Sequence, residues 1–256
     1  MKLSILQPDT LWEDKTSNFA ILEKMISELD SNTDLIILPE MFSTGFTMNT
    51  AENGELSDGE TYRWLKSISE KRLCGICGSY IVRSGRKFYN RWVFVAPESR
   101  SEYYDKRHLF SMGGEHLNFC PGNKRITFKF RGVRIFPEVC YDLRFPVWSS
   151  NTNNYDLLIN SANWPQPRRD VWMTLLKARA LENQCYVAGA NRIGKDGMGI
   201  SYSGDSRIIS PRGEIMASAG KNTACTITAE ISIPGLKKFR KNFPVLKDID
   251  KFSLII

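Results

Sequence analysis

Short apolar runs alternate with amphipathic segments in the first third of the chain, and this pattern predicts an α/β fold. Residues 3–6 alternate weakly and are expected to form a strand, whereas residues 34–40 are mostly a continuous apolar run, typical of a strand covered on both faces. Between them, Asp14 can cap a helix that continues to about residue 29, where apolar side chains recur at helical spacing. Those apolar side chains are therefore expected in the core.

Strand-like runs dominate the rest of the chain. A helix is expected at residues 60–68, followed by a hairpin with strands at 73–82 and 88–95. Further strands are predicted at residues 126–130, 133–139, 155–160 and 185–191, with a helix at 170–184 and a closing antiparallel meander over 206–231. The Gly-containing segment 111–124 lacks such a pattern and is predicted to be a functional loop. Because no repeat or linker interrupts the pattern, residues 1–256 are expected to form one domain.

Composition and charge exclude several classes of protein. With 42% hydrophobic and 25% charged residues, the 256-residue chain can bury a sizeable core. Its net charge of +7 is spread over scattered basic residues, which favours small anionic ligands over nucleic acid. No apolar run approaches the roughly 18 residues of a membrane span, and the first residues are too polar for a secretion signal. We therefore expect a cytoplasmic protein without a membrane partner.

The cysteines are expected to be thiols in that compartment. They are Cys74, Cys77, Cys120, Cys140, Cys185 and Cys225. Cys74 and Cys77 have the spacing of a redox motif, but they lie in a strand-like run and no second pair completes a zinc site. The two histidines, His108 and His116, also lack a clustered set of metal ligands. The sequence therefore predicts neither a metal nor a cofactor.

Three ionisable residues stand at the ends of predicted elements: Glu40, Lys106 and Cys140. A lone cysteine is more often buried filler than a nucleophile, and the other two can be ordinary solvated residues. Together, however, they supply the groups that acyl transfer requires. Glu40 can take the thiol proton of Cys140, and Lys106 can favour the thiolate and stabilise an oxyanion. Spacing alone cannot bring these residues together, because they are far apart in the sequence.

The segments around these residues resemble the nitrilase superfamily of carbon–nitrogen hydrolases, which use a Glu-Lys-Cys triad. Glu40 ends LPE (38–40), Lys106 lies in YDKRHLF (104–110), and Cys140 begins CYDLRFP (140–146), in the order of that family. Finer features resemble its omega-amidase branch, namely EHL (115–117), FPVWS (145–149), ANWP (162–165) and ARALENQ (178–184). The likeness covers nearly the whole chain.

This resemblance implies a four-layer α-β-β-α sandwich that assembles as a homodimer or larger oligomer. It also implies hydrolysis of an amide without a metal, through a thioester on Cys140. Glu40 would be the general base, and Lys106 with the backbone N–H of Tyr141 would hold the oxyanion. Glu115 matches a second family glutamate that positions the substrate or the lysine. The implied substrate is a small amide carrying a carboxylate, such as 2-oxoglutaramate or 2-oxosuccinamate.

The residues that bind the substrate are less directly indicated. Arg168 and Arg169 are candidates for binding the carboxylate, because guanidinium groups suit that ligand. The other candidates are expected to line or cover the pocket, and they are Phe42, Phe46, His116, Asn163 and Trp164. Either arginine can also be a solvated residue at a helix start.

Three residues close to the nucleophile have other interpretations. Glu138 lies where relatives usually carry a small or apolar residue, and a bend at Pro137 is expected to turn it toward a structural partner such as an arginine. Asp142 and Arg144 are expected to form a local ion pair. His108 is expected to be a hydrogen-bonded structural residue beside Lys106.

Other functions stay open at this point. Within the superfamily, the alternatives are an N-carbamoyl amino acid hydrolase, an aliphatic amidase or a nitrilase. A different class is a Cys–His hydrolase, which would pair Cys140 with His108 or His116. A binding scaffold without activity is disfavoured because all three reactive positions are filled.

Overall fold

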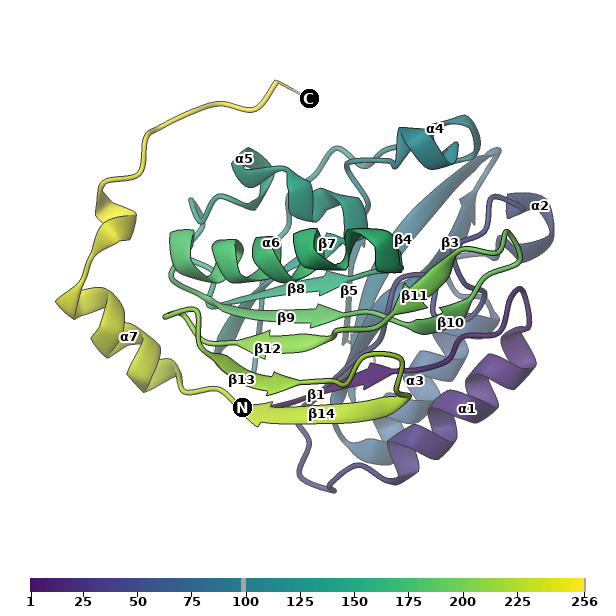
Figure 1. Cartoon of the computed structure of the whole chain (residues 1–256), viewed down its shortest axis with the longest axis horizontal. Coiled ribbons are helices and arrows are strands. Elements are labelled where there is room, and N and C mark those ends of the chain that lie inside the picture. Colours follow the sequence, from purple (N-terminus) through teal and green to yellow (C-terminus); the bar gives the residue numbers. More distant parts are fainter. Residues whose placement is uncertain (98–99, 256) are drawn as a thin grey trace.

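The computed structural model describes residues 1–97 and 100–255, and its centre is a pair of six-stranded sheets (Figure 1). The first sheet has the order β14-β1-β2-β3-β4-β5. Its strands are β1 (Lys2–Gln7), β2 (Leu35–Ile37), β3 (Gly75–Ser84), β4 (Lys87–Ala96), β5 (Arg100–Asp105) and β14 (Cys225–Glu230). The second sheet has the order β13-β12-β9-β8-β7-β6. Its strands are β6 (Phe128–Phe130), β7 (Val133–Val139), β8 (Leu157–Ser161), β9 (Tyr186–Ala190), β12 (Arg207–Ile209) and β13 (Ile215–Ser218).

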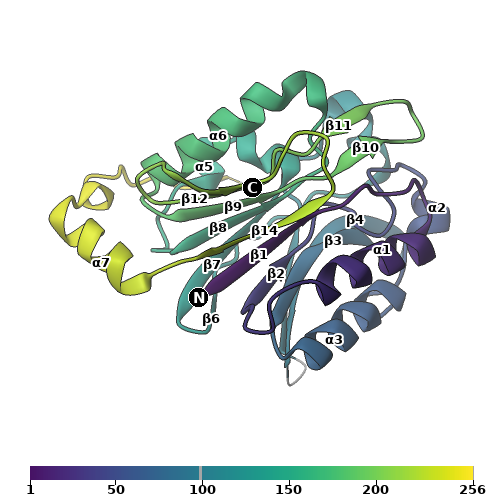
Figure 2. The same ribbon diagram turned by 60° about the horizontal axis from the view of Figure 1, so that its bottom comes forward.

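Helices cover the outer face of each sheet, which gives four layers (Figure 2). The helices α1 (Lys15–Ser27) and α3 (Glu60–Arg72) pack on the first sheet, and α5 (Pro146–Ser149) and α6 (Arg169–Glu182) lie over the second. Asp14 caps α1 by accepting a hydrogen bond from the backbone N–H of Ser17 at 3.0 Å. The remaining helices are α2 (Thr50–Asn53), α4 (Glu115–Asn118) and α7 (Ile233–Asn242). This architecture is the predicted α-β-β-α sandwich.

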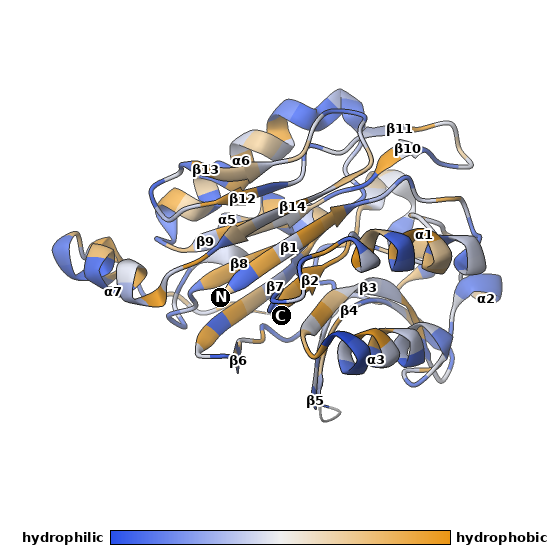
Figure 3. Ribbon diagram, turned by 90° about the horizontal axis from the view of Figure 1, so that it is seen from below, coloured by the Kyte–Doolittle hydropathy of each residue, from blue (hydrophilic) through white to orange (hydrophobic). Residues whose placement is uncertain are grey.

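The hydrophobic core lies between the two sheets, and apolar colouring accordingly follows their strands (Figure 3). Trp92 and Phe94 of β4 meet Phe128 of β6 there, with ring centroids 6.1 and 4.8 Å from that of Phe128. Burying each such side chain contributes roughly 1.5–3 kcal/mol. A smaller apolar cluster holds α1 and α3 against the first sheet through Leu22 and Leu65.

The central strands of both sheets are parallel, and this arrangement positions the site. β1, β2 and β3 run parallel in one sheet, as do β7, β8 and β9 in the other. Residues that follow parallel strands gather at the carboxyl edge of a sheet, where α/β proteins bind ligands. Glu40 follows β2, Cys140 follows β7 and Asn163 follows β8.

Most expected elements are present, and the main correction concerns a long-range strand pairing. The chain after residue 206 is not a simple meander, because β14 leaves the second sheet and pairs antiparallel with β1 in the first. Local alternation was a correct guide to a strand but carries no information about its partner. The sequence pattern did not predict the strand β5, the hairpin of β10 (Ile193–Lys195) and β11 (Ser201–Ser203), or the helices α2, α4, α5 and α7. Within the described residues, no helix is long and apolar enough to cross a membrane.

Candidate active site

Cys140 lies where β7 ends and a 3₁₀ turn, Cys140–Arg144, begins. Its φ of +45° is in the left-handed region, which a residue with a side chain adopts only when its surroundings hold it there. The sharp turn leaves the thiol facing a pocket, and the Sγ atom lies 3.7 Å from the carbonyl oxygen of Asn163. Because Tyr141 is at the start of the turn, its N–H has no carbonyl partner within the turn.

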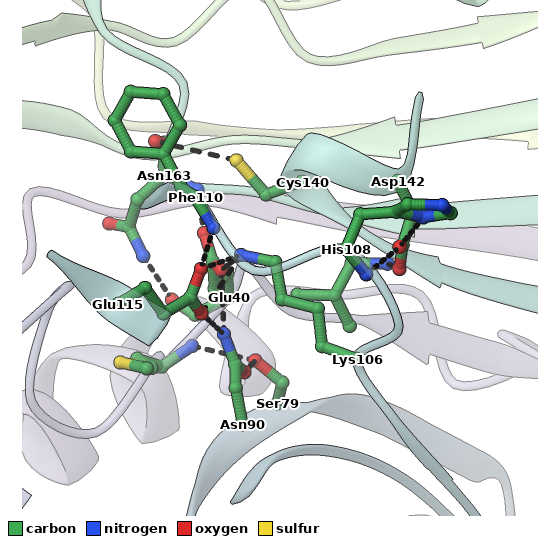
Figure 4. Close-up of polar contacts among 12 residues, drawn as sticks. Glu40, Ser79, Asn90, Lys106, His108, Phe110, Glu115, Cys140, Asp142 and Asn163 are labelled. Carbon is green, nitrogen blue, oxygen red and sulfur yellow. Dashed lines mark hydrogen bonds and ion pairs between the residues drawn. The ribbon is translucent and has the colours of Figure 1, made fainter. Parts of the chain in front are cut away.

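Lys106 occupies the floor of the same pocket between two carboxylates (Figure 4). Its Nζ donates to Oε1 of Glu40 at 2.8 Å and to the two carboxylate oxygens of Glu115 at 3.0 and 2.9 Å. All three side chains are buried, and each is at most 1% exposed. A buried charge is tolerated only when it is paired, so the two carboxylates account for the burial of this lysine.

Two asparagines hold the carboxylates in place, as the dashed lines in Figure 4 show. Asn90 of β4 donates from its Nδ2 to Glu40 at 2.8 Å and to Glu115 at 3.0 Å, and it accepts a hydrogen bond from Ser79 at 2.8 Å. Asn163 donates its backbone N–H to Oε2 of Glu40 at 2.9 Å. Asn90 is not among the site residues that the sequence predicts. Its only signal in the sequence is an uncharged polar residue, next to Arg91, in a strand that is mostly apolar and aromatic.

The electrostatics of the resting site favour a protonated thiol beside an ammonium. Burial raises the pKa of Cys140 well above its usual value, and the charge of Glu40 raises it further, while Lys106 acts in the opposite direction. Burial also acts to lower the pKa of Lys106, but Glu115 and Glu40 outweigh it and the pKa is raised. The pKa of Glu115 is raised by its burial, against the effect of Lys106. Cys140 therefore needs a base before it can attack.

A pocket of about 420 Å³ opens above these groups. Its walls are largely aromatic and apolar, and they include Trp12, Phe46, Met48, Phe110, Trp164, Met198, Ile200 and Tyr202. Tyr141 and Asn163 also line it, and two arginines, Arg144 and Arg168, face it. The space can hold a small organic acid and exclude much of the surrounding water.

The carbon-nitrogen hydrolase family model matches residues 2–241. This chain belongs to that family. It is 44% identical to the omega-amidase YafV of Escherichia coli K12, over 99% of the chain and 98% of that relative. It is 34% identical to the 2-oxoglutaramate amidase of Bacillus subtilis, over 97% of each. The predicted family resemblance is confirmed.

Solved structures agree with the fold of this hydrolase. One is the crystal structure of XC1258 from Xanthomonas campestris, a CN-hydrolase superfamily protein. It matches this chain with a TM-score of 0.96 and 37% sequence identity, and the match covers 99% of this chain and 98% of XC1258. Nit3 of Saccharomyces cerevisiae, from branch 10 of the nitrilase superfamily, has a TM-score of 0.84 at 23% identity, over 95% of this chain and 94% of Nit3. The predicted sandwich is therefore the fold of the nitrilase superfamily.

Three residues predicted to bind substrate do not line the pocket of this hydrolase. Phe42 is buried in the core, where its ring centroid lies 5.7 Å from that of Trp64. His116 is exposed on α4. Arg169 pairs with Asp205, at 2.6 and 3.1 Å, and so faces away from the pocket. The predicted residues that do line the pocket are Phe46, Asn163, Trp164 and Arg168.

The expected ion pair between Asp142 and Arg144 is absent. Asp142 turns inward and accepts hydrogen bonds from the backbone and ring of His108, from Tyr104 and from Val139. Arg144 turns the other way and lies over the ring of Trp164, with its Cζ 5.2 Å from the ring centroid. Sequence neighbours in a tight turn can point to opposite sides, and here this frees Arg144 for the pocket.

Glu138 also differs from its expected arrangement. β7 continues through Pro137, so no bend redirects the side chain, which instead lies on the helix side of the sheet. Its Oε1 accepts a hydrogen bond from the hydroxyl of Ser149 at 2.5 Å, and its Oε2 has no partner within the described residues. Burial, and to a smaller extent the charge of Asp142, raise its pKa to about 7. Glu138 is thus a buried acid behind the nucleophile, and it does not line the pocket.

Proposed function

We propose that this hydrolase is an omega-amidase, which converts 2-oxo dicarboxylic acid monoamides such as 2-oxoglutaramate and 2-oxosuccinamate to the acid and ammonia. The observation that supports it best is a pocket with Cys140 and Lys106 at its floor and two arginines in its wall. The floor groups suit amide hydrolysis, and the arginines suit a carboxylate at the other end of the substrate. The similarity to omega-amidase YafV and to a 2-oxoglutaramate amidase supports the same substrates.

Acylation begins when Glu40 takes the proton of the Cys140 thiol. The sulfur then forms a bond to the amide carbon, and the electron pair of the C=O bond moves to oxygen. Lys106 and the backbone N–H of Tyr141 stabilise that oxyanion, and their fixed positions make this stabilisation effective. Protonated Glu40 next gives its proton to the amide nitrogen, the C–N bond breaks, and ammonia leaves a thioester on Cys140.

Deacylation follows the same sequence of steps, with water as the nucleophile in place of the thiol. Glu40 takes a proton from water, whose oxygen attacks the thioester carbon, and the same oxyanion donors are used again. When the oxyanion collapses, the C–S bond breaks and the thiolate recovers its proton from Glu40. Glu115 does not exchange protons in this scheme. It keeps Lys106 charged and in place through its hydrogen bonds.

Arg144 and Arg168 are the proposed carboxylate anchors. Both are half-buried in the pocket wall, and neither has a carboxylate partner within 4.0 Å in residues 1–97 and 100–255. Each guanidinium instead lies over an aromatic ring, Arg144 over Trp164 at 5.2 Å and Arg168 over Phe110 at 5.3 Å. This stacking orients the donors while leaving them free for a ligand. A substrate carboxylate would supply the missing partner.

Intact-mass spectrometry after rapid quenching tests the proposed intermediate. Mixing the enzyme with 2-oxoglutaramate should add the mass of the substrate minus ammonia, and peptide mapping should place the adduct on Cys140. The adduct should persist in Cys225→Ala, which alters a thiol that does not line the pocket, and disappear in Cys140→Ala. Ammonia release by Cys140→Ala at the wild-type rate would overturn the proposed mechanism.

A substrate panel separates the proposed activity from others in the family. We expect ammonia release from 2-oxoglutaramate and 2-oxosuccinamate to exceed that from aliphatic amides, N-carbamoyl amino acids and nitriles. A Cys–His mechanism has no support in the geometry, because the ring of His108 bonds to Asp142 and His116 is exposed. Cytoplasmic localisation and the lack of a cofactor stay predictions from the sequence, and assembly as a homodimer or larger oligomer stays a prediction from the family resemblance.

A further inference from the structure

Asp142 connects the two chain segments that carry the oxyanion donors. One segment is the turn after β7, which holds Cys140 and Tyr141. Within this turn, Oδ2 of Asp142 accepts the backbone N–H of Val139 at 3.0 Å. The carboxylate thus closes the loop around Cys140, whose left-handed backbone requires such support.

The same carboxylate reaches across to the segment that holds Lys106. Its Oδ2 accepts the hydroxyl of Tyr104 at 2.9 Å, and its Oδ1 accepts the backbone N–H of His108 at 2.9 Å. The Nδ1 of His108 lies 2.8 Å from that same Oδ1 (Figure 4). Tyr104 and His108, which lie two residues before and two residues after Lys106, are therefore both hydrogen-bonded to Asp142.

Packing keeps His108 in the orientation that this contact needs. Its ring stacks on Phe145 with a centroid distance of 3.7 Å and meets Trp148 edge-on at 5.6 Å. Trp148 in turn donates its Nε1–H to the hydroxyl of Tyr104 at 3.0 Å. Asp142 is fully buried, so each lost hydrogen bond would leave a polar group without water to replace it.

We propose that Asp142 and His108 are positioning residues, which fix the distance between Lys106 and the Tyr141 N–H and so shape the oxyanion site. Neither residue touches the substrate, because neither lines the pocket. The inference rests on the proposed function, in which these two donors stabilise the oxyanion together. A displacement of about 1 Å between such groups can cost a hundredfold in rate. The loss should therefore appear in kcat, whereas KM, which depends on the pocket wall, should change little.

A pair of His108 variants separates hydrogen bonding from packing. His108→Phe keeps the ring that stacks on Phe145 but removes the ring N–H, whereas His108→Asn removes the ring and can place its amide N–H near the position of Nδ1. We expect kcat for 2-oxoglutaramate to fall about tenfold or more in His108→Phe, and His108→Asn to recover to within about threefold of wild type. The reverse order, with His108→Phe active and His108→Asn impaired, would overturn the proposal.

Asp142→Asn tests the carboxylate side of the contact between Asp142 and His108. Both oxygens of Asp142 accept hydrogen bonds, so the NH₂ group of asparagine must face a donor and one of these bonds is lost. We expect kcat to fall tenfold to a hundredfold, with a circular dichroism spectrum like that of wild type. Asp156→Asn is the matched control, because Asp156 is also a buried aspartate with backbone and arginine partners, but it lies at the opposite end of β8. It should lower thermal stability and leave kcat unchanged. Equal loss of kcat in both variants would refute a positioning role for Asp142.

A parallel measurement distinguishes a failure of the positioning role from a failure of the proposed function. Cys140→Ser measured in parallel reports whether this thiol carries the reaction at all. If Cys140→Ser abolishes ammonia release while Asp142→Asn and both His108 variants keep wild-type kcat, the positioning inference fails and the proposed function stands. If Cys140→Ser remains fully active, the proposed function fails first.

Discussion

Replacing Glu138 with glutamine should stabilise the folded protein at pH 8 and have little effect at pH 5. Glu138 is fully buried, and its pKa is raised from 4.5 to about 7, mainly by burial and further by the charge of Asp142. Ser149, Arg179 and Asn160 act in the opposite direction without cancelling that rise. In the folded protein Glu138 therefore keeps its proton at a pH where the unfolded chain has lost it.

The sign and size of the effect follow from proton linkage. Between pH 4.5 and 7 the folded state binds one more proton than the unfolded state at this site, so its stability decreases as the pH rises. The full decrease is about 3 kcal/mol, since one pKa unit corresponds to about 1.4 kcal/mol. Glutamine has nearly the same shape as the protonated acid and does not titrate. The free energy of unfolding of Glu138→Gln should therefore not show this decrease as the pH rises.

Urea denaturation of both proteins at pH 5, 6, 7 and 8 measures this difference directly. The free energy of unfolding of Glu138→Gln relative to wild type should rise by about 2–3 kcal/mol between pH 5 and pH 8. Glu52→Gln is the control for an exposed glutamate, and its stability should follow the wild-type pH course. Parallel pH courses for Glu138→Gln and wild type would refute the reasoning, because they would mean that Glu138 is not held protonated in the folded state.

Three further predictions test the pocket, its floor and the core. Arg144→Gln and Arg168→Gln should each raise KM for 2-oxoglutaramate about tenfold to a hundredfold in steady-state assays, whereas Arg169→Gln should not, because only the first two face the pocket. Asn90→Asp adds a charge beside two carboxylates and should lower kcat more than Asn90→Ala does; equal losses would show that charge is not the cause. Leu176→Ala should cost about 2–5 kcal/mol in urea denaturation while the folded fraction keeps its kcat.

Much of the fold was predictable because its elements are locally encoded. The apolar run before Glu40 and the strand before Cys140 both mark central parallel strands, which are covered on both faces and leave a clear pattern. Asp14 is a helix cap in the sequence and in the structure. The pairing of β14 with β1 was not predictable from the pattern, since alternation does not encode which strand is the neighbour.

The motifs of the family located Glu40, Lys106, Glu115 and Cys140, and the structure brings these residues into one buried cluster. Their separation along the chain gave no physical reason for that convergence. The role of Asn90 in the site was not predictable, because a polar residue within a strand is an ordinary feature of sequences. Only its position between two carboxylates distinguishes it.

The sequence by itself determined the family and the reactive groups, because the motifs that carry them are short runs of the residue types that the chemistry requires, and the four layers followed from the resemblance to that family. Tertiary structure decided which arginines face the pocket, where the carboxylates point and which protons they hold. Arg144 and Asp142 are two residues apart, yet one lies in the pocket wall and the other is fully buried. Orientation and burial of this kind arise from contacts with distant segments, such as Tyr104 and His108 on Asp142, and they set the charge and position of each group.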